Sequence, residues 1–152
     1  MTEQSHFERD TRITSTGAGR WSTQLSAAWN IGTNPNGGYL ILPVLRAMSS
    51  LVDQPDPITV TTHYLRPGLA GAEAEIRAEL VKPGRLASNL RGSMHQDGKP
   101  RLESLVAFAD LDTSTGPDVD ITIPAPDIPP PDECIVRSGS DQGVELALLS
   151  RA

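Results

Sequence analysis

The chain has 152 residues, with 13 Lys and Arg against 19 Asp and Glu, so its net charge is −6. This length predicts one domain that buries its own core. The lone Cys134 excludes an internal disulfide and a cysteine-built zinc site. The acidic excess argues against a nucleic-acid-binding protein. No apolar run approaches the roughly 20 residues that span a bilayer, and the first residues lack the basic start and apolar stretch of a signal peptide, so we expect a cytoplasmic protein.

The first predicted element is a strand over residues 21–31. Its odd positions are mostly apolar and its even positions mostly polar, and this period of two indicates a strand with one buried face. The odd positions are Trp21, Thr23, Leu25, Ala27, Trp29 and Ile31. Residues 32–36 are rich in Gly, Pro and Asn and predict a break after the strand.

A nearly continuous apolar stretch from Gly38 to Val52 follows the break. At about 15 residues it is too long for a typical strand and too short for a membrane span, so it predicts a largely buried helix. Asn36 is the expected N-cap of this helix. Pro43 falls inside it, where the missing amide removes one hydrogen bond and can kink the axis.

The remainder of the domain predicts strands joined by turns, because β-branched or alternating apolar residues recur between Pro-Gly and Asp-Gly pairs. The predicted strands are residues 58–66, 73–82, 85–96 and 101–111. Asp97 and Gly98 form a strong hairpin signal between the last two of these strands. A buried helix with antiparallel strands indicates an α+β domain whose sheet curls around the helix.

Charge and proline divide the chain further. Residues 64–101 hold seven basic and four acidic residues, a net of +3, whereas residues 102–136 hold eight acids and no Lys or Arg. Six of the 13 prolines lie between Pro117 and Pro131, and proline lacks an amide donor and disfavours helix. We predict a domain over residues 1–112, an acidic Pro-rich linker over 113–133 and a tail over 134–152.

Several of these stretches resemble the acyl-CoA thioesterase II (TesB-like) family. Residues 36–40 (Asn-Gly-Gly-Tyr-Leu) are similar to its loop-to-helix entry, and residues 62–68 (Thr-His-Tyr-Leu-Arg-Pro-Gly) to the strand end that follows the helix. Residues 84–85, 96–100 and 107–109 and the Pro-Ala-Pro of residues 124–126 also look like that family. The resemblance implies the hotdog fold, in which a curved antiparallel sheet wraps a central helix.

The chain of that family normally carries two hotdog units in tandem, and this sequence is similar to the first unit and the linker. Residues 143–152 look like the opening strand of a second unit that then stops. A lone unit leaves the inter-unit surface of the family exposed, so the resemblance implies a homodimer formed by hotdog pairing. It also implies an acyl-CoA substrate whose thioester is hydrolysed.

The resemblance places the candidate site at the start of the predicted helix. A helix N-terminus can stabilise an oxyanion, which makes Gly37 and Gly38 candidate catalytic positions, and His63 is a candidate base. The alternatives are a tight turn for the glycines and a packed or solvent-facing histidine. The resemblance also implies substrate contacts, which we expect at Asn36, Tyr39, Thr61, Arg66 and Arg85. The alternatives are a core residue for Tyr39 and a solvated sheet face for the basic region around Arg85.

Other parts of a catalytic site are missing from the sequence. The predicted helix contains no acid, and its only charge is Arg46. In the resembling family the catalytic Asp, Thr or Ser, and Gln come from the second unit, and residues 106–108 (Val-Ala-Phe) in the corresponding strand here cannot polarise water. His6 and His95 lack partners at a metal-binding spacing, so we expect no metal and no cofactor.

Three functions therefore remain open. The first is an acyl-CoA thioesterase domain. The second is a catalytically inactive acyl-CoA-binding or structural remnant. The third is a hotdog hydratase acting on enoyl-CoA, which is weaker because it needs an Asp and a His in the loop and helix, and residues 34–36 (Asn-Pro-Asn) supply neither.

Overall fold

The computed structural model describes residues 5–113 and 121–133, and the chain divides into two units, Met1–Ser114 and Thr115–Ala152. The elements of the first unit are α1 (His6–Asp10), β1 (Thr14–Gly17), β2 (Arg20–Gln24), the 3-10 helix η1 (Ala27–Trp29), β3 (Asn30–Ile31), β4 (Asn34–Pro35), α2 (Gly37–Ser49), β5 (Asp56–Tyr64), β6 (Glu73–Lys82), β7 (Ala87–Gln96) and β8 (Lys99–Ala109). The described residues of the second unit form one 3-10 turn, η2 (Pro131–Glu133).

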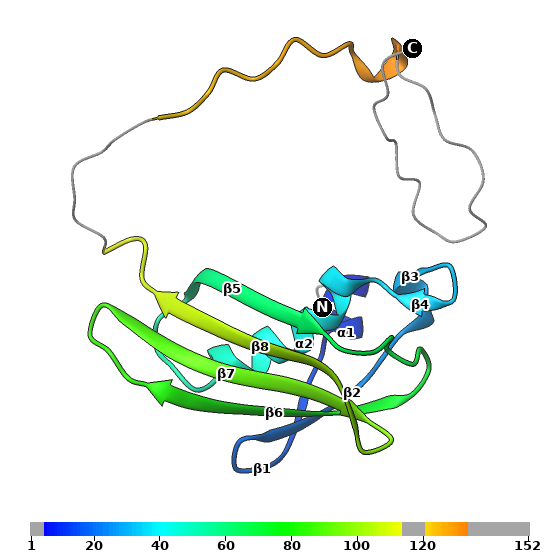
Figure 1. Cartoon of the computed structure of the whole chain (residues 1–152), viewed down its shortest axis with the longest axis vertical. Coiled ribbons are helices and arrows are strands. Elements are labelled where there is room, and N and C mark those ends of the chain that lie inside the picture. The colour runs from blue at the N-terminus through cyan, green and yellow to red at the C-terminus, as the bar shows by residue number, and fades with distance from the viewer. Residues whose placement is uncertain (1–4, 114–120, 134–152) are drawn as a thin grey trace. The chain divides into compact units, whose positions relative to one another are not determined.

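Six strands of the first unit form one antiparallel sheet in the order β1-β2-β6-β7-β8-β5. The sheet is curved, and α2 lies against one of its faces (Figure 1). The predicted α+β class, with a curved antiparallel sheet around a helix, is confirmed. Within residues 5–113 and 121–133, strand β5 is at one edge of the sheet and pairs only with β8.

Helix α2 begins where the sequence predicts it. The side chain of Asn36 accepts a hydrogen bond from the Gly38 amide at 2.7 Å, which satisfies one unpaired donor of the first turn. Pro43 lies inside the helix, so the Tyr39 carbonyl four residues earlier lacks its usual amide donor. The helix ends at Ser49, before the predicted Val52.

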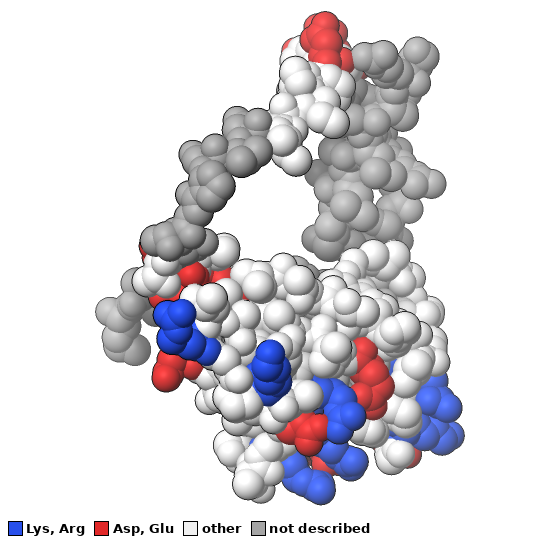
Figure 2. Space-filling view, turned by 60° about the vertical axis from the view of Figure 1, so that its left-hand side comes forward, with Lys and Arg blue, Asp and Glu red and all other residues white. Residues whose placement is uncertain are grey.

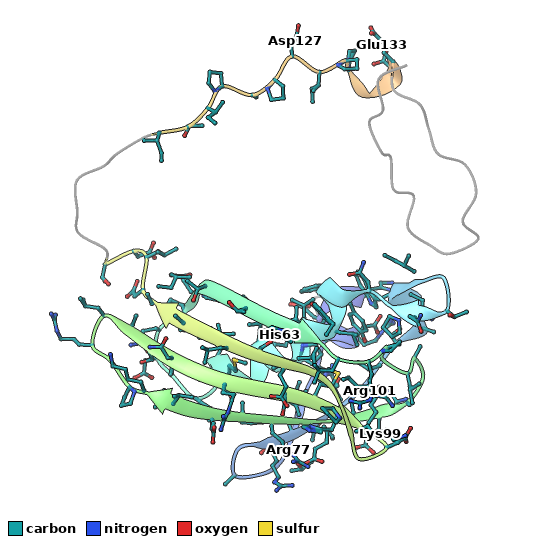
Figure 3. The ribbon with its side chains drawn as sticks, in the orientation of Figure 1. His63, Arg77, Lys99, Arg101, Asp127 and Glu133 are labelled. Atoms are coloured by element: carbon teal, nitrogen blue, oxygen red, sulfur yellow. The ribbon has the colours of Figure 1, made fainter. Side chains whose placement is uncertain are left out.

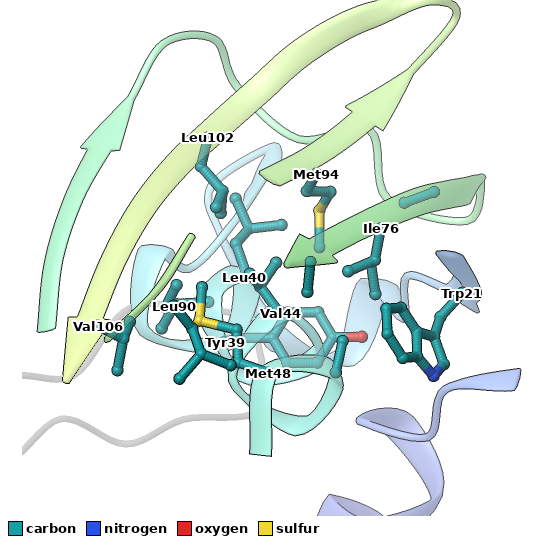
Figure 4. Packing of buried hydrophobic residues seen from close by; sticks show 14 of the residues in the cluster. Trp21, Tyr39, Leu40, Val44, Met48, Ile76, Leu90, Met94, Leu102 and Val106 are labelled. Atoms are coloured by element: carbon teal, nitrogen blue, oxygen red, sulfur yellow. The ribbon is translucent and has the colours of Figure 1, made fainter. Parts of the chain in front are cut away.

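The buried face of α2 packs on β6 and β7. Gly92 of β7 permits this approach, because a methyl group there would overlap Met48 Cε and lie 2.7 Å from Val44 Cγ1. Alternate residues of the neighbouring strands complete the core around the helix (Figure 4). The core residues are Trp21, Leu25, Tyr39, Leu40, Ile41, Val44, Ala47, Met48, Ala74, Ile76, Ala78, Leu90, Met94, Leu102, Val106 and Phe108.

The predicted strand over residues 21–31 is wrong in its second half. Strand β2 ends at Gln24. Ser26 breaks the pattern because its side chain accepts from the Ala28 amide at 3.2 Å and caps η1, while its own amide donates to the Tyr39 hydroxyl at 2.8 Å. Residues 30–35 then form the β3–β4 hairpin, whose first strand contains the last two residues of the predicted strand and whose second strand lies in the predicted break.

The N-terminal segment forms two elements that the sequence analysis did not predict, α1 and β1. Helix α1 starts with a capping box between Ser5 and Glu8. At its end, Asp10 accepts from Trp29 Nε1 at 3.0 Å, and the Asp10 carbonyl accepts from the Tyr39 hydroxyl at 2.9 Å. These bonds hold α1 against the stacked rings of Trp29 and Tyr39, whose centroids are 5.7 Å apart.

The four strands predicted after the helix are confirmed, with ends shifted by up to two residues. The turn between β7 and β8 is also confirmed, since Asp97 and Gly98 both have positive φ angles of 53° and 69°, as a tight hairpin requires. Beside this turn the register of the two strands shifts between Met94 and His95. The shift leaves Arg101 in a bulge of β8.

The predicted linker is described over residues 121–133. These residues contain no strand, and their isoleucines are exposed, Ile121 and Ile123 by 86% each. The predicted division into a domain over residues 1–112, a linker over 113–133 and a tail over 134–152 stays a prediction. The predicted opening strand of a second unit falls in the tail over 134–152, which lies outside the described residues.

Candidate functional site

The first turn of α2 presents the predicted oxyanion site. The side chain of Asn36 accepts the hydrogen bond of the Gly38 amide, and the Asn36 carbonyl accepts from the Leu40 amide at 3.0 Å. In the described part of the chain, the amide of Gly37 has no acceptor, and this residue is only half-buried. Gly37 therefore offers a free donor, whereas Gly38 offers one only if Asn36 moves.

Tyr64 of β5 joins this helix start to the edge of the sheet. Its hydroxyl donates to the Gly37 carbonyl at 2.7 Å, and a side chain at Gly37 would lie 3.2 Å from the tyrosine ring. Burial raises the pKa of Tyr64, which keeps the phenol in its donor form. The sequence analysis did not select Tyr64, although strand alternation places it on the same face as Val60 and Thr62.

The Leu-Arg-Pro-Gly segment, residues 65–68, is fastened to the β7–β8 hairpin. The amides of Leu65 and Arg66 both donate to the Arg101 carbonyl, at 2.8 and 3.2 Å. The Arg101 guanidinium donates to the Pro67 carbonyl at 3.1 Å. The bulge therefore turns Arg101 toward the motif, and both its backbone and its side chain hold the segment.

Two further contacts seat the segment between the hairpin and α2. The amide side chain of Gln96 accepts from the Leu69 amide at 2.8 Å and donates to the Leu69 carbonyl at 2.9 Å. Gly68 lies against the helix, because a methyl group there would be 2.8 Å from Leu40 Cδ2. The motif thus braces the first turn of α2, and neither Gln96 nor Arg101 was selected from the sequence.

Tyr39 lies in the core. It is 3% exposed, and its hydroxyl both donates to the Asp10 carbonyl and accepts from the Ser26 amide. Burial raises its pKa. Tyr39 is therefore a core residue, as the alternative interpretation of the sequence held. Its substrate contact stays a prediction.

His63 and Thr61 lie on the face of the sheet that points away from α2. Across the β5–β8 ladder His63 pairs with Glu103 and Thr61 with Leu105, and these β8 positions alternate with the buried, helix-facing ones. Both His63 and Thr61 are exposed, and His63 is labelled in Figure 3. The structure does not bring the predicted base to the predicted oxyanion site.

Arg66 and Arg85 lie at opposite ends of the sheet. Arg66 is exposed beside the β7–β8 hairpin and donates to the Pro100 carbonyl at 3.1 Å. Arg85 is exposed in the turn between β6 and β7, which is tied to the chain after α2 by a bond from Gln54 to the Gly84 carbonyl at 2.8 Å. One phosphate group could not contact both arginines.

The face of the sheet away from α2 carries ion pairs. Glu75 accepts from Arg20 and from Arg77 at 2.9 Å each, and Figure 2 shows basic and acidic side chains intermixed on the side of the molecule it presents. Among the described residues, no group of three or more His, Cys, Asp or Glu side chains could hold a metal ion. No helix in the described ranges is long and apolar enough to cross a membrane.

Comparison with protein families matches residues 25–110 to the acyl-CoA thioesterase N-terminal domain. A search of curated proteins gives no match. A candidate thioesterase II from Thermobifida fusca YX is 29% identical, with a TM-score of 0.81 over 94% of this chain and 53% of its own. A protein of unknown function with a hot dog fold from Alicyclobacillus acidocaldarius is 20% identical, with a TM-score of 0.78 over 93% and 52%.

A third similar structure is a Bacillus halodurans protein solved with CoA, which is 22% identical, with a TM-score of 0.57 over 65% of this chain and 71% of its own. The chain spans about half the length of the first two proteins. Their likeness confirms the hotdog fold, and the family match covers α2, β5 and the Leu-Arg-Pro-Gly segment. The chain belongs to the family of acyl-CoA thioesterase N-terminal domains.

Proposed function

We propose that this domain binds acyl-CoA thioesters and supplies one side of the groove in which they are hydrolysed. The proposal is carried by the family match over residues 25–110, because this range contains the free Gly37 amide and the motif packed beside it. The similar Bacillus halodurans protein was solved with CoA, which supports the same class of ligand.

Hydrolysis adds water to the carbonyl carbon of the thioester, breaks the C–S bond and releases a carboxylic acid and the CoA thiol. Negative charge develops on the carbonyl oxygen in the transition state, and an amide at a helix N-terminus stabilises it. The Gly37 amide has this role in our proposal. Losing one such donor typically lowers kcat by about 10²–10³-fold.

We propose that a second hotdog unit supplies the group that activates water. Helix α2 contains no acid and no histidine, and His63 lies on the opposite face of the sheet from α2. If no second unit provides this group, the domain binds acyl-CoA without hydrolysing it. That inactive domain is the second candidate function.

We also propose that two copies of the chain pair along β5. One side of this strand has no partner strand among the described residues, and three of its large apolar side chains are exposed: Ile58 by 44%, Val60 by 44% and Tyr64 by 51%. An open apolar edge favours pairing with another strand, and two identical edges pair about a twofold axis.

Light scattering of the wild type and of Val60→Lys tests the pairing. We expect a dimer for the wild type and a monomer for the variant at the same concentration, because lysine at an edge strand opposes pairing. Leu86→Lys is the matched control, since Leu86 is 73% exposed but lies outside β5. A wild type that is monomeric and folded at micromolar concentration would refute the homodimer.

A thiol reagent that detects released CoA tests hydrolysis with acyl-CoAs of several chain lengths. We expect any turnover to persist in His63→Ala, because His63 lies on the opposite face of the sheet from α2. Turnover that disappears in this variant would restore His63 as the base, and binding without turnover would favour the inactive domain. A protein that neither binds nor hydrolyses any acyl-CoA would refute the proposed function.

A further inference from the structure

The two ends of the sheet differ in charge. The end where α2 begins holds three cations, Arg66, Lys99 and Arg101, against one acid in the hairpin, Asp97. The first turn of α2 adds the positive end of the helix dipole. This end of the domain should therefore attract anions.

The cations are placed by specific contacts. Arg101 is 8% exposed, and its Nε has no partner among the described residues. Its guanidinium lies 3.6 Å from the carboxylate of the exposed Asp97, so these two charges offset each other and Arg66 and Lys99 supply the positive excess of this end. Arg66 is fixed beside Arg101 by the bond to the Pro100 carbonyl. Lys99 pairs in register with the buried Gln96 and therefore lies on the helix side of the sheet. Figure 3 shows Lys99 and Arg101 together at the hairpin.

The other acids near the hairpin, Glu73 and Glu75, lie on the opposite face of the sheet. Glu75 pairs in register with His95 and alternates with the buried Ala74 and Ile76, so it points away from α2. Its charge is already matched by Arg20 and Arg77. Glu75 therefore does little to cancel the cations on the helix side.

The end where α2 finishes is acidic. Asp56 of β5 accepts from the Leu111 amide at 2.9 Å, which draws the acids before β5 and those after β8 together. The acids of this end are Asp53, Asp56, Asp110 and Asp112. Three cations oppose them in the described chain, Lys82 and Arg85 of the β6–β7 hairpin and Arg46 in the last turn of α2. Four acids against three cations leave this end slightly acidic, and the dipole of α2 has its negative end here.

We infer that the phosphate groups of a CoA thioester bind Arg66 and Lys99 at the β7–β8 hairpin, beside the buried Arg101 and its ion pair with Asp97. The inference rests on the proposed function and adds a direction to it. The nucleotide of the ligand lies at the hairpin, and the thioester lies at the first turn of α2. Arg85, the other predicted arginine contact, lies at the acidic end and does not bind the phosphates.

Isothermal titration with octanoyl-CoA tests this direction. Arg66→Gln and Lys99→Gln each remove one charge at the hairpin, and the matched controls Lys82→Gln and Arg85→Gln each remove one at the other end; all four side chains are exposed. We expect about tenfold weaker binding for each hairpin variant and a change within about twofold for each control. S-octanoyl pantetheine, which has no phosphates, should bind all five proteins alike.

Each other result has a definite meaning. Weaker octanoyl-CoA binding in the controls, with none in the hairpin variants, would overturn the inference and leave the proposed function standing. An equal loss of pantetheine ester binding would show that the hairpin variants disturb the thioester site, which also overturns it. A wild type that binds neither ligand would refute the proposed function and the inference together.

Discussion

Strands β7 and β5 both pair with β8, one on each side, yet only one of them is covered. Six of the ten residues of β7 are buried, whereas none of the nine residues of β5 is. The cause is the position of α2, which packs on β6 and β7. The domain is therefore built around the covered strand, β7. The open strand, β5, leaves apolar surface for a partner or a ligand.

The helix start is where these two regions meet. Gly92 lets α2 approach the covered strand, and Tyr64 bonds the first turn of α2 to the open strand. The covered side should govern folding, and the open side should govern binding. The following changes test that division, from the largest expected effect to the smallest.

Gly92→Ala should disrupt the covered strand most. The added methyl overlaps Met48 Cε and crowds Val44, so α2 must shift, and overpacking of this kind typically costs about 1–3 kcal/mol. Urea denaturation measures the loss of unfolding free energy. Arg91→Gln is the control, because Arg91 is the preceding residue, its side chain is 64% exposed and its partner Glu79 is also exposed; it should change stability by less than about 0.5 kcal/mol. Equal effects would show that close helix packing at Gly92 is not required.

Asp10→Asn should weaken the cover that α1 provides over Trp29 and Tyr39. The hydrogen bond from Arg9, and then that from Trp29, hold the pKa of the Asp10 carboxyl below its usual value, although burial opposes them. A lowered folded pKa means stability that is present above the unfolded pKa, about 3.9, and is lost as the pH falls through the folded pKa. We expect the variant to be about 1 kcal/mol less stable at pH 7.

The difference between wild type and Asp10→Asn should begin to shrink as the pH falls below about 4, where Asp10 of the unfolded chain protonates. It should vanish below the lowered pKa of the folded protein, where the folded Asp10 carries no charge either. Thermal unfolding at several pH values measures it. Asp53→Asn removes one exposed charge elsewhere in the same unit and serves as the control. A difference that stays constant at low pH would show that the charge of Asp10 is not what holds α1.

Tyr64→Phe should weaken the contact between the first turn of α2 and β5, with a smaller loss of unfolding free energy than Gly92→Ala. It removes the hydroxyl that donates to the Gly37 carbonyl, and a single bond of this kind contributes about 0.5–1.5 kcal/mol. Hydrogen exchange should become faster in the first turn of α2 and not in β7. His63→Phe is a control on the neighbouring residue, whose side chain is on the other face. Unchanged exchange would mean that Tyr64 does not fix the helix start.

The distance in sequence between interacting residues explains which features the sequence could predict. The start of α2 and the β7–β8 turn depend on local signals, the Asn36 cap and the Asp97-Gly98 pair, and both were predicted correctly. The break at Ser26 depends on the Tyr39 hydroxyl, and the role of Tyr64 depends on the Gly37 carbonyl. Each partner is distant in sequence, so no local pattern contains it.

The candidate site was predicted in pieces for the same reason. The resemblance to a family indicated which residues form the motif and in which order, and these residues do lie near the helix start. The strand order β7-β8-β5 and the two-residue period then decide that His63 points away from α2 and that Arg85 lies far from Arg66. The order of residues along the chain does not show which strands become neighbours in the sheet.

Arg77→Gln should have the smallest effect, although it removes two hydrogen bonds to Glu75. The two side chains are 48% and 38% exposed, and exposed ion pairs contribute about 0–1 kcal/mol. We expect a loss below about 0.5 kcal/mol that disappears in 1 M salt, where charges are screened within about 3 Å. A loss comparable to that of Gly92→Ala would show that the outer face also holds β6 and β7 in place. The contrast between covered and open strands would then be a property of both faces and could no longer be attributed to α2 alone.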